Sequence, residues 1–179
     1  MKLLFHCCCG PCAVACVKSL DAEGIAPSLF WYNPNIHPTT EYKSRRDSLF
    51  ALAAAKNLSL EKIDEYGLRL FLRETRDETE TPGRCRICYR IRLEKTAAFA
   101  VEHGYDAFST SLLVSPYQQH EIIKMLGKEL AGQYGIEFLY RDFRPLFREG
   151  QAEARALGLY MQKYCGCIYS DEERYEKMP

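Results

Sequence analysis

The 179-residue sequence has no excess of charge of either sign. It contains 24 lysines and arginines and 24 aspartates and glutamates, so its formal net charge is zero. This balance excludes a protein that coats nucleic acid through bulk positive charge. A nucleic-acid partner would need a local basic patch instead.

Long apolar runs are also missing. No stretch approaches the ~20 apolar residues that a membrane-spanning helix needs. The segment from Met1 to His6 is too short for the apolar core of a secretion signal and runs directly into cysteines. We therefore expect a cytoplasmic protein with no membrane partner, in a compartment where structural disulfides are rare.

The common nucleotide-binding loops are absent as well. No Gly-x-Gly-x-x-Gly sequence follows a predicted strand, and no Walker loop or Ser-Gly-Gly loop follows the first one. We therefore expect neither NAD nor ATP as a cofactor.

The sequence does contain alternating strand and helix patterns. The predicted strands cover residues 2–6, 26–32, 58–63, 106–110 and 137–141, and the predicted helices cover 12–23, 40–57, 68–73, 84–103, 115–134 and 148–158. Thr40 is expected to cap the second helix, and Ser115 the fifth, with Pro116 in its first turn. This alternation predicts an α/β fold with a parallel sheet. We expect one domain over residues 1–179, with a cysteine-bearing tail over about 160–179.

Nine cysteines are the unusual feature of the composition: Cys7, Cys8, Cys9, Cys12, Cys16, Cys85, Cys88, Cys165 and Cys167. The first four follow the first predicted strand, at the sheet edge where ligands bind in folds of this class. In a reducing compartment, clustered cysteines indicate a metal site or redox chemistry.

Two pairs, Cys8-Cys9 and Cys85-x-x-Cys88, supply four thiolates near helix N-termini. Four thiolates suit either tetrahedral zinc or a 4Fe-4S cluster. Adjacent cysteines reach different irons of a cluster more easily than they reach one small ion, which favours the cluster. Zinc stays open, and with it a zinc-stabilised RNA-binding module without catalysis.

A third group, Cys165-Gly166-Cys167, can close a small and strained disulfide ring that is easily reduced. The alternatives are two further metal ligands or two inert thiols. Basic residues flank the second cysteine pair and are candidates for phosphate contacts: Arg84, Arg86, Arg90 and Arg92.

Six blocks together resemble the epoxyqueuosine reductase family of the QueH type. In chain order they are His6-x-Cys8-Cys9-x-Pro11-Cys12, Tyr32-Asn33-Pro34-Asn35-Ile36-His37-Pro38-x-x-Glu41-Tyr42, Cys85-x-x-Cys88-Tyr89-x-x-Arg92-Leu93, Ser115-Pro116-Tyr117-Gln118, Asp142-Phe143-Arg144 and Tyr164-Cys165-Gly166-Cys167. They span nearly the whole chain. The resemblance implies a Rossmann-like domain related to nucleotide-binding HUP proteins, with helices on both faces of the sheet.

The resemblance also implies an activity. Members of that family reduce epoxyqueuosine to queuosine at the wobble position of tRNAs with a GUN anticodon, using a 4Fe-4S cluster and a redox-active cysteine pair but no cobalamin. Removing the epoxide oxygen takes two electrons and two protons, and an open iron position can act as a Lewis acid on that oxygen. The electron donor is not identified by the sequence.

Carried over motif by motif, the resemblance assigns the cluster to Cys8, Cys9, Cys85 and Cys88. It makes Cys165 and Cys167 the redox pair. Cys7 competes with Cys9 as a ligand, although the spacing from His6 favours Cys8-Cys9.

Three further assignments concern the surroundings of the cluster. Cys12 is a candidate catalytic residue that could hold an additional iron ion, and Cys16 is expected to pack in the core. Candidates for proton delivery or substrate positioning are Asp142, Tyr117, His120 and His37.

Overall fold

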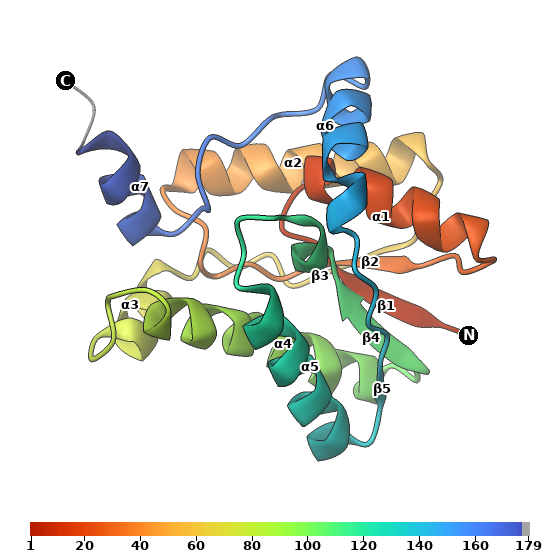
Figure 1. The fold of residues 1–179 in the computed structure, drawn as a ribbon, viewed down its shortest axis with the longest axis horizontal. Helices are drawn as coiled ribbons and strands as arrows, with labels where there is room; N and C mark the ends of the chain where they lie inside the picture. The colour runs from red at the N-terminus through yellow and green to blue at the C-terminus, as the bar shows by residue number, and fades with distance from the viewer. Residues whose placement is uncertain (177–179) are drawn as a thin grey trace.

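A computed structural model describes residues 1–176 of the protein (Figure 1). Its five strands form one parallel sheet in the order β3-β2-β1-β4-β5. They are β1 (Leu3–His6), β2 (Ser28–Trp31), β3 (Leu60–Lys62), β4 (Ala107–Thr110) and β5 (Glu137–Phe138). This order is that of a Rossmann-like sheet, in which the chain crosses over after β3 and continues on the other side of β1. The α/β prediction is confirmed.

Helices cover both faces of the sheet. Figure 1 shows α1 (Gly10–Ala22), α2 (Thr39–Ala55) and α6 (Phe147–Ala156) on one face, and α4 (Gly83–Glu102) and α5 (His120–Tyr134) on the other. The shorter helices α3 (Leu68–Thr75) and α7 (Ile168–Tyr175) lie beyond one edge. Both layers pack on buried strands that are apolar on each side, such as Leu3-Leu4-Phe5, as expected for a parallel sheet. No helix within residues 1–176 has the length and apolarity needed to cross a bilayer.

Several predicted helix starts were wrong. The first helix begins at Gly10 rather than Cys12, because Pro11 occupies the first turn, where its missing N–H costs nothing. The second begins at Thr39, after Pro38, so Thr40 is not its cap. Ser115 and Pro116 do not open a helix: a 3-10 helix covers Ser111–Val114, and α5 begins only at His120.

The carboxyl ends of β1, β2 and β4 meet at one edge of the sheet. His6, the last residue of β1, ties them together: its Nδ1 lies 2.9 Å from Thr110 Oγ1, and its Nε2 lies 3.2 Å from Asn33 Oδ1. Asn33 in turn donates to the carbonyl oxygen of Cys7 at 2.9 Å. His6 is therefore a buried packing residue, and the loops that follow the three strands gather at one place. The end of the predicted tail, residues 177–179, lies outside the described residues.

Candidate functional site

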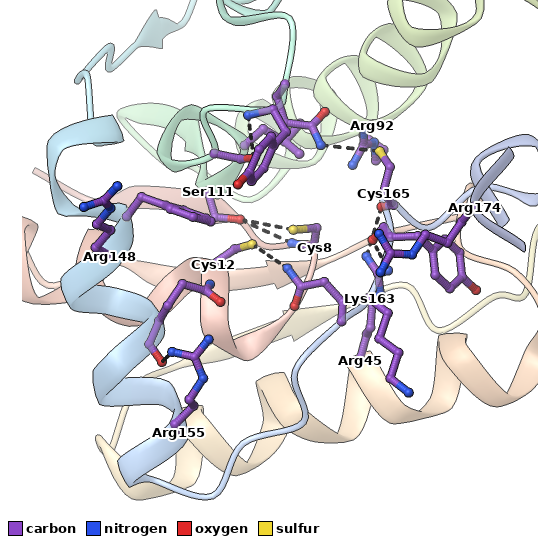
Figure 2. A pocket seen from close by; sticks show the side chains of 18 residues that line it. Cys8, Cys12, Arg45, Arg92, Ser111, Arg148, Arg155, Lys163, Cys165 and Arg174 are labelled. Atoms are coloured by element: carbon purple, nitrogen blue, oxygen red, sulfur yellow. Dashed lines mark hydrogen bonds between the residues drawn. The ribbon is translucent and has the colours of Figure 1, made fainter. Parts of the chain in front are cut away.

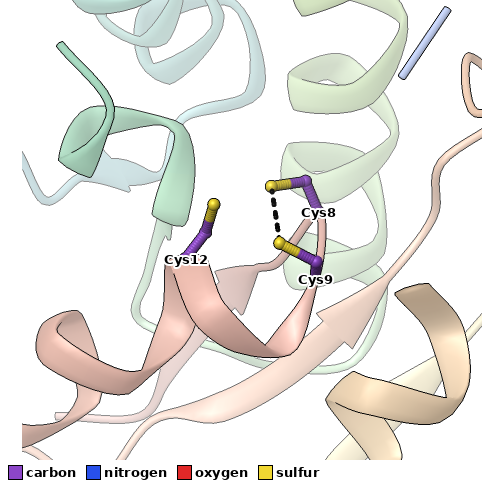
Figure 3. A group of neighbouring side chains, drawn as sticks. All are labelled: Cys8, Cys9 and Cys12. Carbon is purple, nitrogen blue, oxygen red and sulfur yellow. Dashed lines mark hydrogen bonds between the residues drawn. The ribbon is translucent and has the colours of Figure 1, made fainter. Parts of the chain in front are cut away.

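Three cysteines gather where β1 passes into α1. The sulfur atoms of Cys8, Cys9 and Cys12 all lie within 4.8 Å of one another (Figure 3). Gly10 permits this turn to lie against α2, since a Cβ there would be 2.6 Å from Ser48 Oγ and 2.7 Å from its carbonyl oxygen. Three soft, mutually close donors at a helix N-terminus suit a thiophilic metal ion or cluster.

The electrostatics of this group single out Cys8. Hydrogen bonds from the Cys12 and Cys9 thiols, together with the nearby charges of Arg45 and Arg92, hold the pKa of Cys8 well below its usual range. The pKa of Cys12 is raised, mainly because its thiol donates to Cys8, and burial raises the pKa of Cys9. Of the three cysteines, Cys8 is therefore the one whose surroundings favour the thiolate form.

The other two cysteines of this region face elsewhere. Cys7 points into the core with its sulfur 3.3 Å from the Phe5 carbonyl oxygen, and burial raises its pKa. Cys16 donates to the carbonyl oxygen of Cys12 at 3.3 Å, one turn earlier on α1. The sulfur group thus contains Cys9 and not Cys7, and Cys16 packs in the core as expected.

The second cysteine pair lies at the start of α4, outside this group. Cys88 is buried in an apolar cluster with Phe71 and Cys167, and Cys85 is half-buried. Burial raises the pKa of Cys85 to about 11 and that of Cys88 to about 12. The structure therefore brings Cys8 and Cys9 together with Cys12, and places Cys85 and Cys88 beside the tail.

Arg92 connects the two cysteine groups. Its side chain is buried, donates from Nη2 to Cys88 Sγ at 3.2 Å, and lines the same cavity as Cys8. Among residues 1–176 it has no carboxylate partner. A buried guanidinium that faces thiols suits an anionic sulfur site.

The tail brings Cys165 to the same cavity. Cys165 is exposed and accepts a hydrogen bond from Gln118 Nε2 at 3.4 Å. Cys167 is buried and caps α7, because its sulfur accepts from the main-chain N–H of Ser170 at 3.4 Å. Both are free thiols here, as are the other seven cysteines.

Two residues that the sequence did not single out hold the tail and the cysteine group in place. Gln162 donates to Cys12 Sγ at 3.2 Å and accepts from Cys9 Sγ at 3.3 Å. Arg45 pairs with Glu41 at 2.6 Å. The spacing of Glu41 and Arg45, four residues apart on one helix face, was a signal for this pair; Gln162 had no comparable signal.

Part of each of these groups lines one cavity of about 650 Å³: Cys8 and Cys12 of the sulfur group, Arg45, Arg92, and Gln162 and Cys165 of the tail (Figure 2). The wall includes Cys8, Cys12, Arg45, Arg92, Ser111, Leu112, Ser115, Tyr117, Gln118, Phe147, Arg148, Gln151, Arg155, Gln162, Lys163, Tyr164, Cys165 and Arg174. Its volume lies within the usual range for small-molecule sites. The cavity therefore offers sulfur, charge and amide groups to one ligand.

Other predicted site residues lie away from this cavity. Asp142 is exposed and held by Arg144, whose hydrogen bonds lower its pKa to about 2, so it carries no proton near neutral pH. His120 faces Tyr140, with 3.0 Å between Nε2 and the hydroxyl oxygen. His37 is buried against the tail. Of these candidates only Tyr117 lines the cavity.

Two of the four arginines of α4 that are candidates for phosphate contacts are buried rather than exposed. Arg84 is buried and pairs with Glu173 at 2.6 Å, and Arg92 is buried beside Cys88. A helix buries one face, and these two positions lie on the face that packs inward. Arg90 pairs with Glu129 at 2.5 Å, and Arg86 is exposed.

The family model and the curated relatives that match this chain carry the same family name. Residues 3–173 match the family model described as Epoxyqueuosine reductase QueH. A protein of that name from Dehalococcoides mccartyi is 39% identical over 176 residues, covering 98% of this chain and 96% of the relative. Another from Thermotoga maritima is 35% identical over 184 residues, covering 98% of this chain and 93% of the relative.

A solved structure supports the fold. A predicted subunit of tRNA methyltransferase from Methanocaldococcus jannaschii superposes with a TM-score of 0.57, covering 87% of this chain and 75% of that one. The two sequences are only 11% identical, so this likeness concerns the Rossmann-like fold alone.

Proposed function

The chain belongs to the epoxyqueuosine reductase QueH family, a family of oxidoreductases, and from this premise we propose that it reduces epoxyqueuosine to queuosine at the wobble position of tRNAs with a GUN anticodon. One observation carries the proposal: Cys8, Cys12 and Cys165 line the same cavity of about 650 Å³. A modified base in that cavity would meet the sulfur site and the exposed thiol of the tail together. We place the reaction in the cytoplasm.

The donor chemistry of the site fits an iron-sulfur cluster. Cys8 and Cys9 are close together, with 3.8 Å between their sulfurs, and as the further ligands we propose Cys85 and Cys88, which lie outside this sulfur group at the start of α4. When bound, a 4Fe-4S cluster would supply single electrons and an acidic iron for the epoxide oxygen. Cys12, beside Cys8, is the candidate ligand for an additional iron ion.

The tail cysteines would supply the electron pair. An epoxide becomes an alkene and one water when it takes up two electrons and two protons. Oxidation of the Cys165 and Cys167 thiols to a disulfide releases two electrons and two protons, so the reaction balances. An external reductant must then return the disulfide to two thiols.

The residues around Cys165 position it for this role. Arg45 holds the main-chain carbonyl of Cys165 at 3.0 Å, and Gln118 donates to its sulfur. Arg92, which lines the same cavity, adds positive charge beside the thiols. Desolvation raises the pKa of the Cys165 thiol, and the Gln118 hydrogen bond and the charges of Arg92 and Arg45 oppose that rise.

The test separates the redox thiols from the metal ligands. Cys165→Ser should abolish reduction of epoxyqueuosine-containing tRNA while the iron content of anaerobically purified protein stays at the wild-type value. Cys16→Ser is the matched control, because it changes a buried cysteine of α1 that only packs. Loss of iron in Cys165→Ser would make Cys165 a ligand instead. A colourless protein with one zinc would favour the alternative, a zinc-stabilised RNA-binding module.

A further inference from the structure

The outer wall of the cavity carries a local excess of positive charge. Four of its side chains are exposed cations: Arg148, Arg155, Lys163 and Arg174. Within residues 1–176 none of the four forms an ion pair, and no carboxylate lines the cavity. Some exposed arginines elsewhere are paired, for example Arg144 with Asp142 at 2.6 Å, and the exposed unpaired ones among the described residues, Arg69 and Arg86, do not line this cavity. In a chain of zero net charge, this concentration indicates an anionic ligand.

Helix α6 aligns two of these cations with each other. Arg148 and Arg155 are seven residues apart, or two turns, so they share a face and stand roughly 10 Å apart along the axis. The opposite face is fixed against α1 by small residues: Ala154 is fully buried, and a Cβ on Gly150 would lie 2.8 Å from Ala15 Cβ. This packing directs both guanidinium groups to the cavity side.

The tail forms the other side. Figure 2 shows Arg148 and Arg155 on one side of Cys8 and Cys12, and Lys163 and Arg174 on the other. The segment with Lys163 is fixed, because the next residue, Tyr164, accepts from Arg45 Nη2 at 2.8 Å. Two pairs of basic side chains, one from α6 and one from the tail, therefore flank the opening that leads to the sulfurs.

An aromatic platform, Tyr117, also lines the cavity. Tyr117 is 83% exposed, the largest exposure among the large apolar and aromatic side chains of residues 1–176. Its ring contacts that of Phe147 edge to face, with 5.8 Å between the centroids. With this exposure, Tyr117 offers an aromatic ring on which a base can stack. Side-chain amides of Gln118, Gln151 and Gln162 also line the wall, and amides can read base edges.

We propose that α6 and the tail bind the sugar-phosphate backbone on the two sides of the nucleotide that enters the cavity, and that a neighbouring base stacks on Tyr117. This inference rests on the proposed function and adds where the RNA docks. Phosphates explain the unpaired cations, and unstacked bases explain the exposed aromatic ring and the amides. An acidic protein would meet the same charges but would leave the cavity and the platform unfilled.

The experiment measures binding of a fluorescein-labelled anticodon stem-loop RNA with a GUN anticodon by anisotropy, over a series of salt concentrations. Arg148→Glu combined with Arg155→Glu should weaken binding at least ~10-fold and lower the slope of log Kd against log salt by about 1.4, because each phosphate contact with a single strand contributes about 0.7. Tyr117→Ala should weaken binding roughly tenfold and leave the slope unchanged, since stacking releases no counterions.

The matched control combines Arg73→Glu with Arg76→Glu, two exposed positions that do not line the cavity. Its Kd should stay within about twofold of wild type. Wild-type affinity and slope in the α6 variant would overturn the inference. An equal loss of RNA affinity in the control variant would do so too, as would polyglutamate that competes with the RNA for wild-type protein as well as unlabelled RNA does. Reduction of epoxyqueuosine is assayed separately. If RNA binding depends on the α6 arginines but epoxyqueuosine is not reduced, only the proposed function is refuted. If the α6 substitutions leave the reduction of epoxyqueuosine unchanged, only this inference is refuted.

Discussion

Arg45 reaches from α2 to the tail and donates from Nη1 to the carbonyl oxygen of Cys165 at 3.0 Å, with a guanidinium that is only 2% exposed. The same side chain pairs with Glu41, which also accepts from the Tyr160 hydroxyl. One buried ion pair therefore fixes the position of the candidate redox segment.

Arg45→Met should lower the free energy of unfolding by about 3–5 kcal/mol, because it leaves the Glu41 carboxylate buried without its partner. It should also speed hydrogen exchange at the tail amides. Urea unfolding and exchange mass spectrometry measure the two effects. Arg46→Met, the next residue on the helix, removes a pair with Asp64 that is partly exposed and should cost less than about 1 kcal/mol. Equal losses in the two variants would contradict the assigned role.

Gly166 is required next to Arg45. Its φ is +125°, and a Cβ there would lie 3.0 Å from Arg45 Nη1. Gly166→Ala should therefore destabilise the protein by about 1–3 kcal/mol and loosen the tail. Gly132→Ala on α5 is the control: nothing lies within 4 Å of its Cβ position, so it should stabilise the helix by roughly 0.5–1 kcal/mol. Thermal unfolding of both variants checks the contrast.

His37 makes the tail contact sensitive to pH. Its Nδ1 accepts from the Ile168 N–H at 3.2 Å, and its Nε2 donates to the Pro34 carbonyl oxygen at 3.0 Å. Burial lowers its pKa from 6.5 to about 4. Between these values the unfolded chain binds a proton that the folded chain does not, so stability falls as the pH falls from about 6.5 toward 4.

The change from pH 7 to pH 5 should cost roughly 1–2 kcal/mol through His37. Burial also lowers the pKa of His6 to about 4, so the wild-type loss is larger than that from one histidine. His37→Gln should remove roughly 1–2 kcal/mol of it, measured by urea unfolding at the two pH values. A variant with the full wild-type pH dependence would exclude this contribution of His37.

Gln162 is a neutral neighbour of the sulfur group, and a negative charge at this position should weaken metal binding there. Gln162→Glu keeps the size of the side chain but places a carboxylate beside Cys9 and Cys12, where it repels thiolates. We expect iron content after anaerobic purification to fall at least twofold, or about 0.4 kcal/mol in binding free energy. Gln151→Glu is the control, because Gln151 lines the same cavity from α6 without a hydrogen bond to these sulfurs.

The sequence was informative where a pattern repeats or a motif is local. Alternating strands and helices predicted the parallel sheet, and the strand end at His6 predicted where Cys8 and Cys9 lie. Contacts between distant segments left no such signal. Gln162 meets Cys12 only because the tail crosses back over α1, and Arg92 turns inward only because of how α4 packs. Helix starts at Gly10 and His120 were misplaced because a proline in the first turn of a helix, as at Pro11, and a proline in a turn before a helix, as at Pro116, look alike in sequence.

The contact between Cys9 and Gln162 joins residues 153 positions apart. During translation, the N-terminal cysteines therefore leave the ribosome long before the segment that covers them has been made. For that interval Cys8, Cys9 and Cys12 lie on a nascent chain that lacks their contacts with the tail. The part of the cavity wall that Gln162, Lys163 and Cys165 supply is added only when the last part of the chain folds back, so the sulfur group is more accessible during synthesis than in the finished protein.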